Sequence, residues 1–357
     1  MRLYGKRWHG CRVDEFTWRG QRLIVLENEI LRVGVLASKG SDIIEFRYKP
    51  RDLDVMWHSP HSLLPGDFIP TSARPAGAFL DYYPGGWQEV FPSAGPETVI
   101  AGAELGQHGE TPLLPWDVHV QQDTASRLEV DFVVETVRMP FRLRRRMILS
   151  AGLPALRLEE EAVNLGEQEL PYAWGHHPAF GPPLLEAGCR IEMPACEVVE
   201  PPYAEALTRR FAVGQPSRFP YLTDLRGDRQ PMNEVPSAAS HTQDVVVASQ
   251  LTGNWCALRN PARKLAVGLV WDTAVFPYLW MWQVYGGAFG YPYYGRTYNL
   301  ALEPFNGPVE PLARLAEQGR ARVLGPGQSV TAVLECGIYE APAEVRGIEY
   351  GGRLRTA

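Results

Sequence analysis

Alternation of apolar and polar residues with a period of two is the feature that most constrains the fold of this 357-residue chain. Successive side chains of a β-strand point to opposite faces, so this period is typical of strands that are buried on one side. We predict strands at residues 22–27, 30–36, 41–48, 116–121, 127–135, 141–150, 155–164, 244–249, 255–259, 265–271, 278–285, 298–303 and 329–339. The best helical candidate, residues 312–320, is short.

Turn-forming residues are abundant between these segments, with 34 glycines and 31 prolines in the chain. Many short strands joined by Gly- and Pro-rich turns are typical of an all-β sandwich or barrel, and such folds often exceed 200 residues as one domain. We therefore predict a single domain over residues 1–357. The irregular segments 60–103 and 200–243 are long for a compact domain, and loops of that length are usually functional or act as lids.

Charge and cysteine content exclude several classes of protein. The net charge of -6 argues against broad binding to nucleic acid. No apolar run approaches the ~20 residues of a membrane-spanning helix, and residues 1–10 lack the apolar stretch of a secretory signal. The five cysteines are few and widely spaced, which fits reduced, buried thiols in the cytoplasm: Cys11, Cys189, Cys196, Cys256 and Cys336.

Several common catalytic motifs are missing from the sequence. It contains no P-loop, no H-E-x-x-H and no G-x-S-x-G, and the glycines at 286–290 lack the spacing of a dinucleotide-binding loop. The simplest enzymatic option is therefore acid–base chemistry without a metal or another cofactor.

Three polar clusters lie among apolar and aromatic residues, at residues 107–110 (Gln-His-Gly-Glu), 174–181 (Trp-Gly-His-His-Pro-Ala-Phe-Gly) and 302–307 (Leu-Glu-Pro-Phe-Asn-Gly). Each has an ordinary structural interpretation, because a His beside Gly or Pro is often a turn residue. A Glu at a strand end is usually a solvated carboxylate. Since adjacent strand residues face opposite ways, at most one of His176 and His177 is expected to enter a given pocket.

In order and spacing, the clusters resemble the aldose 1-epimerase (galactose mutarotase-like) superfamily. The matching elements are His108-Gly109 with Trp116, His177-Pro-Ala-Phe180 and Glu303 in Leu-Glu-Pro. The segment at residues 85–92 resembles the glycine-rich loop of related branches, and residues 324–328 resemble the family's usual ending. The resemblance, over roughly residues 20–340, implies a large antiparallel β-sandwich with few short helices.

The resemblance also implies an activity, the interconversion of α and β anomers of a free aldose by ring opening. Glu303 would be the base at the anomeric hydroxyl, His177 the acid at the ring oxygen, and His108 would hold and polarise that oxygen. The family's sugar-binding Asp and Arg have no clear match, and Arg74, Asp81 and Asp272 are the candidates. The predicted substrate-binding residues are His176, Trp87, Gln88, Glu89, Arg74, Asp272 and Trp282, with Trp280 and Tyr285 as further stacking candidates.

Three alternatives remain open from the sequence. The chain could be a non-catalytic carbohydrate-binding protein, or another carbohydrate enzyme, such as a lyase or hydrolase, on the same sandwich. It could also be an epimerase of hexose 6-phosphates, for which Arg74 and Arg296 are candidate phosphate ligands. The expected partner is a monosaccharide or sugar derivative, without nucleic acid or membrane, bound by a monomer or homodimer.

Overall fold

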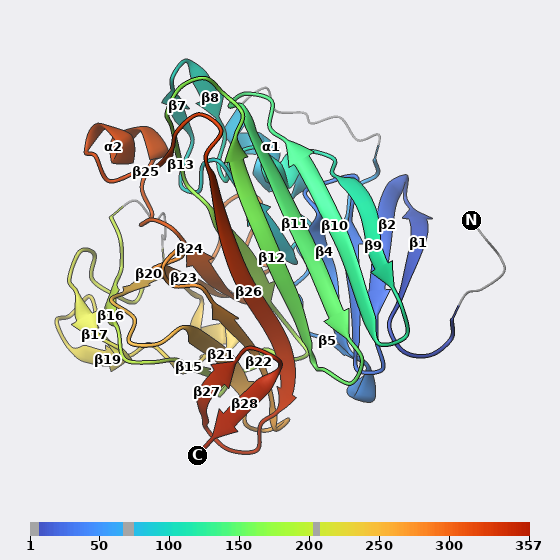
Figure 1. The fold of residues 1–357 in the computed structure, drawn as a ribbon. Helices are drawn as coiled ribbons and strands as arrows, with labels where there is room; N and C mark the ends of the chain where they lie inside the picture. Colours follow the sequence, from blue (N-terminus) through green and yellow to red (C-terminus); the bar gives the residue numbers. More distant parts are fainter. Residues whose placement is uncertain (1–6, 67–74, 203–207) are drawn as a thin grey trace.

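Antiparallel β-strands make up most of the computed structural model, which describes residues 7–66, 75–202 and 208–357 (Figure 1). The described residues form two short α-helices, α1 (Pro75–Tyr82) and α2 (Leu312–Glu317), the second within the predicted helical segment. Three 3₁₀ turns accompany them: η1 (Lys49–Arg51), η2 (Thr111–Leu113) and η3 (Ala238–Ser240). The predicted all-β fold class is confirmed.

Two large sheets carry the fold. Among the described residues the larger has twelve strands, in the spatial order β1 (Arg12–Trp18), β2 (Gln21–Glu27), β3 (Leu31–Leu36), β4 (Asp42–Tyr48), β6 (Trp87–Val90), β14 (Gly175–Phe180), β24 (Tyr298–Phe305), β23 (Tyr278–Tyr285), β20 (Thr242–Ser249), β16 (Glu197–Val199) and β17 (Ser217–Arg218), with β5 (Leu53–Asp54) paired to β4. The smaller has eight in the same part of the chain, β15 (Arg190–Glu192), β21 (Trp255–Asn260), β22 (Leu265–Trp271), β26 (Ser329–Glu340), β12 (Ala155–Asn164), β11 (Phe141–Ser150), β10 (Arg127–Glu135) and β9 (Asp117–Asp123).

The two sheets pack face to face and bury the core between them (Figure 1). Strand β11 shows why the sequence folds this way, because Phe141, Leu143 and Met147 alternate along it and are fully buried. One continuous core cluster contains residues from Cys11 to Ile338. On this basis we propose that the chain is a single domain.

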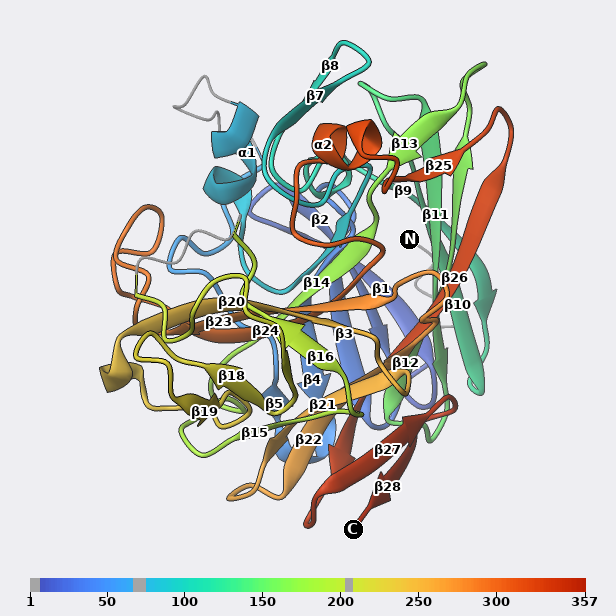
Figure 2. The ribbon, with the colours of Figure 1, turned by 90° about the vertical axis from the view of Figure 1, so that its left-hand side faces the viewer.

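Four two-stranded sheets in the described residues extend the sandwich: β7 (Thr98–Ile100) with β8 (Ala103–Leu105), β13 (Leu170–Tyr172) with β25 (Arg322–Leu324), β18 (Tyr221–Thr223) with β19 (Arg229–Pro231), and β27 (Val345–Glu349) with β28 (Arg353–Thr356). All of them are hairpins except β13 with β25, whose strands are distant in the sequence. Helices α1 and α2 and the β7–β8 hairpin lie at one end of the molecule, and β27–β28 lies at the other (Figures 1 and 2). No helix in the described residues is long and apolar enough to cross a bilayer.

The segment predicted to be irregular at residues 60–103 contains α1 and a central strand of the larger sheet, β6. This strand has only four residues, and all of them are buried, so neither its length nor an alternating pattern marks it in the sequence. The five cysteines are all buried and form no disulfide.

Candidate active site

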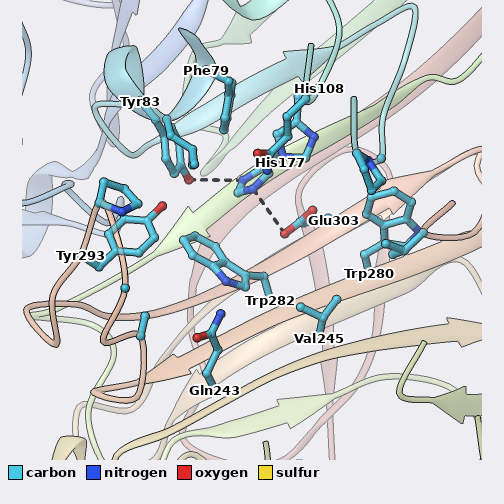
Figure 3. A pocket seen from close by; sticks show the side chains of 18 of the residues that line it. Phe79, Tyr83, His108, His177, Gln243, Val245, Trp280, Trp282, Tyr293 and Glu303 are labelled. Carbon is cyan, nitrogen blue, oxygen red and sulfur yellow. Dashed lines mark hydrogen bonds and ion pairs between the residues drawn. The ribbon is translucent and has the colours of Figure 1, made fainter. Parts of the chain in front are cut away.

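A cavity of about 470 Å³ lies over the larger sheet, on the face that carries His177 (Figure 3). This face points away from the smaller sheet, because the preceding residue, His176, faces the other way and contacts Glu160 of the smaller sheet. Its size lies within the range of about 300–1,000 Å³ that is usual for small-molecule sites. The central strands β14, β24, β23 and β20 form its floor. Strand pairing sets Glu303 directly beside Trp280, and antiparallel register brings His177 of β14 next to Glu303. Three neighbouring strands of the sheet therefore place a histidine, a carboxyl group and an indole side by side, although β14 is distant in the sequence from β23 and β24.

His177 and Glu303 form the polar centre of the cavity. The Nε2 atom of His177 and Oε1 of Glu303 are 3.7 Å apart, which is too long for a hydrogen bond (Figure 3). Burial raises the pKa of Glu303 well above its ordinary value. Burial, with a smaller contribution from nearby His108, lowers the pKa of His177 to about 3. Both shifts favour the uncharged forms.

His108 reaches the same cavity from a tight turn. Its backbone is left-handed, with φ +62°, and is followed by Gly109 at φ +74°, where an added Cβ would come within 2.5 Å of the carbonyl oxygen of Phe91. The ring lies 5.2 Å from that of His177, centroid to centroid. Its Nδ1 is 2.5 Å from the carbonyl oxygen of Ala94, so Nδ1 carries a proton and donates it. Burial lowers the pKa of His108 to about 4, and the neutral ring therefore presents Nε2 as an acceptor.

Aromatic side chains form the walls. Tyr83 and Phe79 stack with centroids 4.9 Å apart, on one side of His177. Trp282 lies on the other side of His177, at 5.6 Å, and also packs against Tyr293. Flat apolar faces beside a few polar groups suit a ligand such as a sugar, which has both C–H faces and hydroxyls.

The charged residues of the lining are all acidic in the part of the chain that the structure describes. Glu303 lies at the floor and Glu97 at the rim, and no Lys or Arg of the described residues lines the cavity. Gln107 and Gln243 add neutral amides. This lining favours an uncharged ligand over an anionic one.

Of the predicted site residues, the structure brings His177, Glu303, His108 and Trp282 together in this cavity, and Trp280 joins them. Arg74 lies outside the described residues. Asp81 lies outside the lining and accepts a hydrogen bond from Tyr291, and Arg296 is exposed beside Tyr293.

Three other predictions need correction, because His176, Trp87 and Glu89 lie on the opposite face of β14 and β6. All three are fully buried between the sheets. The Trp87 indole donates to Nδ1 of His176 at 3.3 Å, and the Trp174 indole donates to Oε1 of Glu89 at 2.5 Å. The strand alternation that turns His177 into the cavity turns these side chains into the core, away from any substrate.

Gln88, Asp272 and Tyr285 also lie outside the cavity. Gln88 shares the face of His177 but is fully buried, and its amide donates to the carbonyl oxygen of Gly85. Asp272 follows β22 in the smaller sheet, where it receives a backbone N–H in a turn and borders a separate depression. Tyr285 is buried with its hydroxyl bonded to Gln283. The predicted contacts of Gln88 and Asp272 with substrate are thus corrected.

A second polar group lies beneath the cavity, on the core side of β14. We call Glu89, Arg145, Glu160 and His176 the buried tetrad, since all four side chains have no solvent exposure. The Nε atom of Arg145 is 3.4 Å from Oε2 of Glu89 and 3.2 Å from Oε1 of Glu160. Nε2 of His176 is 3.1 Å from Oε2 of Glu160.

The two carboxyl groups and the imidazole of the tetrad could in principle hold a metal ion, because their ligand atoms lie within 4.8 Å of one another. However, the Arg145 guanidinium already lies against both carboxyl groups and supplies the positive charge there. Burial and the neighbouring Glu160 raise the pKa of Glu89 to about 8, and burial lowers the pKa of His176 to about 4. Burial also raises the pKa of Glu160, and the neighbouring Arg145 opposes that shift. One ionised carboxyl group is enough to balance the charge of Arg145, so charge neutrality of the tetrad requires no metal.

Sequence reasoning missed Tyr83, Phe79, Tyr293 and Gln243, which line the cavity beside the predicted residues. Tyr83 and Phe79 come from the segment at residues 60–103, whose length was the only signal that it contributes to a site. Tyr293 comes from the Gly- and Tyr-rich loop after β23, and Gln243 from the start of β20.

Comparison with known proteins places the fold. A family model described as "Domain of unknown function (DUF4432)" matches residues 18–338. No curated protein sequence gives a significant match. A solved structure from Klebsiella pneumoniae, provisionally named an aldose 1-epimerase, is 16% identical with a TM-score of 0.71, covering 90% of this chain and 80% of that one.

Two further solved structures are similar over their whole lengths. The galactose mutarotase related enzyme of Lactobacillus acidophilus is 16% identical with a TM-score of 0.59, covering 89% of this chain and 98% of that one. A galactose mutarotase-like protein of Clostridium acetobutylicum is 14% identical with a TM-score of 0.59, covering 93% and 99%. At these identities the likeness shows the fold, and the mutarotase-like β-sandwich implied by the sequence resemblance is confirmed.

Proposed function

The chain belongs to the family described as domain of unknown function (DUF4432), and for this member we propose a mutarotase activity. In this proposal the cavity interconverts the α and β anomers of an uncharged free aldose by acid–base ring opening. The observation that carries it is the pair of Glu303 and His177 at the cavity floor, 3.7 Å apart and buried. A site that only binds sugar needs no such pair of titratable groups with pKa values moved in opposite directions.

The reaction needs a base and an acid at neighbouring oxygens of the sugar. The Glu303 carboxylate takes the proton from the anomeric hydroxyl while Nε2–H of His177 protonates the ring oxygen. The bond between C1 and the ring oxygen then breaks and gives the open-chain aldehyde. After rotation about C1–C2, the ring oxygen attacks the other face of the aldehyde, returns its proton to His177, and the new anomeric oxygen regains one from Glu303. No atom or proton is gained or lost.

The two groups share a single proton before substrate binds. Because burial raises the pKa of Glu303 and lowers that of His177, the empty cavity favours a protonated carboxyl beside a neutral imidazole. Moving that proton to His177 gives the carboxylate and imidazolium of the first step without changing the net charge of the pair. The pair is thus able to exchange a proton in either direction, as a reversible ring opening requires.

His108 takes a different role from the one predicted. A neutral His108 donates through Nδ1 to Ala94 and has only an acceptor, Nε2, to offer. Polarising the ring oxygen would require the imidazolium form, which burial disfavours. We therefore assign His108 to accept a hydrogen bond from a sugar hydroxyl.

The lining also bears on the choice of sugar. A phosphorylated substrate calls for Arg or Lys at the rim, and no described residue of the lining supplies one. The acidic side chain of Glu97 at the rim of the cavity would repel a phosphate or a uronic acid. The faces of Trp282 and Tyr293 suit the C–H face of an uncharged hexose or pentose.

The test is anomer exchange measured by NMR with the purified protein and a panel of free aldoses, hexose 6-phosphates and uronic acids. We expect exchange above the uncatalysed rate for an uncharged aldose, reduced at least a hundredfold in Glu303→Gln and in His177→Asn. The matched control is Glu135→Gln, an exposed carboxyl at the end of β10, which should keep full activity.

Two outcomes would contradict the proposal. Exchange that survives in both cavity variants would remove Glu303 and His177 from the reaction. Binding of an aldose without exchange of any sugar in the panel would instead identify a carbohydrate-binding protein.

A further inference from the structure

In the part of the chain that the structure describes, the His177 ring has a single hydrogen-bond partner, Tyr83. This tyrosine follows α1 and lies in the wall of the cavity, with 2% of its surface exposed. Its Oη is 3.3 Å from Nδ1 of His177 (Figure 3). The two rings meet edge to face, with centroids 5.4 Å apart and an interplanar angle of 73°. Nε2, at the other end of the imidazole, points to Glu303.

The contact between Tyr83 and His177 allows two arrangements of protons. In one, the phenol donates to Nδ1, and the single ring proton of the neutral imidazole is then on Nε2. In the other, Nδ1–H donates to the phenol oxygen, and Nε2 has a lone pair. The two arrangements differ in whether Nε2 of the neutral ring is able to take up a proton.

The chemistry at Nε2 decides between them. An imidazole that gives a proton to the ring oxygen and later takes it back must be left, between these steps, with a lone pair on Nε2. Its remaining proton must then be on Nδ1, where the phenol oxygen of Tyr83 lies within reach. The opposite tautomer would have to form an imidazolate in order to act as an acid at Nε2, which is not accessible near neutral pH.

We propose that Tyr83 is a positioning residue that accepts the Nδ1–H of His177 and turns its own O–H toward the cavity, where it donates to a hydroxyl of the bound sugar. This inference rests on the proposed function. It assigns to Tyr83 two tasks that phenylalanine cannot perform, since both use the hydroxyl.

Packing around Tyr83 is consistent with a fixed hydroxyl. The phenol ring stacks on Phe79 with centroids 4.9 Å apart and an interplanar angle of 25°, and Trp57 contacts it at 5.5 Å. Rigid packing of this kind limits the positions of Oη to those near Nδ1. His108, the neighbouring imidazole, is held in the same Nδ1–H form by the carbonyl oxygen of Ala94. The two rings would therefore present Nε2 in the same way.

The tautomer can be measured without any activity, from the ¹⁵N chemical shifts of histidine side chains in labelled protein at neutral pH. The His177 signals are assigned with His177→Asn. In the wild-type protein we expect the Nδ1–H form of His177. In Tyr83→Phe we expect loss of that form or a mixture of the two tautomers. Tyr293→Phe is the matched control, because Tyr293 is a buried tyrosine of the same cavity that does not contact His177, and its loss should leave the His177 tautomer unchanged.

Folding of each variant is checked by the His108 signals, which should stay in the Nδ1–H form throughout. A wild-type His177 in the Nε2–H form would overturn the inference, and so would a Tyr83→Phe spectrum identical to that of the wild type. In the exchange assay we expect Tyr83→Phe to lower kcat about tenfold or more.

The two proposals fail separately. Absence of anomer exchange together with an Nδ1–H tautomer that depends on Tyr83 would reject the activity and leave the contact standing. Exchange by a protein whose His177 is in the Nε2–H form would reject the role of Tyr83 alone.

Discussion

Replacing Arg145 by methionine is expected to destabilise the protein strongly, and more so as the pH rises. Arg145 lies on β11 in the smaller sheet, fully buried, and its guanidinium contacts Glu89 and Glu160 from the core side of the cavity strands. It also donates to the carbonyl oxygen of Ser41 at 3.0 Å. Methionine fills much of the same space but removes the positive charge that compensates the buried carboxyl groups.

The magnitude follows from the geometry. With Glu160 ionised and its Oε1 at 3.2 Å from Nε of Arg145, the attraction is about 5 kcal/mol at an effective dielectric constant of about 20. Removing one partner of a buried ion pair typically costs about 3–5 kcal/mol. We expect a loss in this range for Arg145→Met at pH 8.5. The loss should be smaller at pH 5.5, where Glu160 escapes the penalty by binding a proton.

The sign of the pH dependence comes from linkage. Without Arg145, the pKa of the buried carboxyl groups rises further above the unfolded value, because the charge that lowers it is gone. A raised folded pKa contributes stability that is present below the unfolded pKa and is lost as pH increases through the folded one. The deficit of Arg145→Met must therefore grow with pH.

The assay is urea unfolding at pH 5.5 and 8.5, with Arg142→Met as the control, since Arg142 lies on the same strand and is exposed. Adding Glu160→Gln to Arg145→Met removes the uncompensated charge and should recover a large part of the loss. A loss below about 1 kcal/mol, a deficit that is independent of pH, or no recovery in the double variant would refute the reasoning.

Three further outcomes are expected. Because the proposed active form needs the one proton shared by Glu303 and His177, kcat/KM for anomer exchange should fall as pH rises through the raised pKa of Glu303 and the pair loses that proton, which a pH–rate profile measures. Burial and nearby Asp244 raise the pKa of Glu200 to about 8, so the stability that this group contributes to the wild-type protein is lost as pH rises from about 4.5 through 8. Glu200→Gln should remove this pH dependence, which would be measured as a smaller change in unfolding free energy between pH 5 and 9. Trp282→Ala should raise the KM for the aldose about tenfold with less effect on kcat, since the indole offers a stacking face and no proton.

The fold was predictable because strands leave a strong mark in the sequence when one face is buried. The long strands of the smaller sheet show this, and β11 and β12 have the bounds expected from their alternation. Strand β6 was not predictable in the same way, since it is four residues long and buried on both faces. Its place in the centre of the larger sheet depends on pairing with β4 and β14, which no local pattern reveals.

The site residues that follow a recognisable order along the chain could be predicted from the sequence. The residues that tertiary packing brings to the cavity could not. The order of His108, His177 and Glu303 matched a family pattern, and the structure places all three in one cavity. Tyr83 and Tyr293 join them through loops whose courses are fixed only by tertiary contacts. The buried position of Arg145 could have been predicted from the sequence alone. Arg145 alternates along the strand with Phe141 and Leu143 and so shares their inward face, although the arginines next to it face outward.

The alternation along β14 has a consequence for interpreting variants. His177 faces the cavity, and His176, the residue before it, belongs to the buried tetrad on the other face, so a change in the tetrad can shift the backbone that positions the proposed acid. If Arg145→Met lowers activity by shifting this strand, activity should recover together with stability when Glu160→Gln is added. If activity stays low while stability recovers, loss of the Arg145 contacts alters the position of the strand even though the double variant restores the neutral charge of the tetrad. Measuring both quantities on the same two variants therefore shows whether activity at the cavity follows the stability of the tetrad.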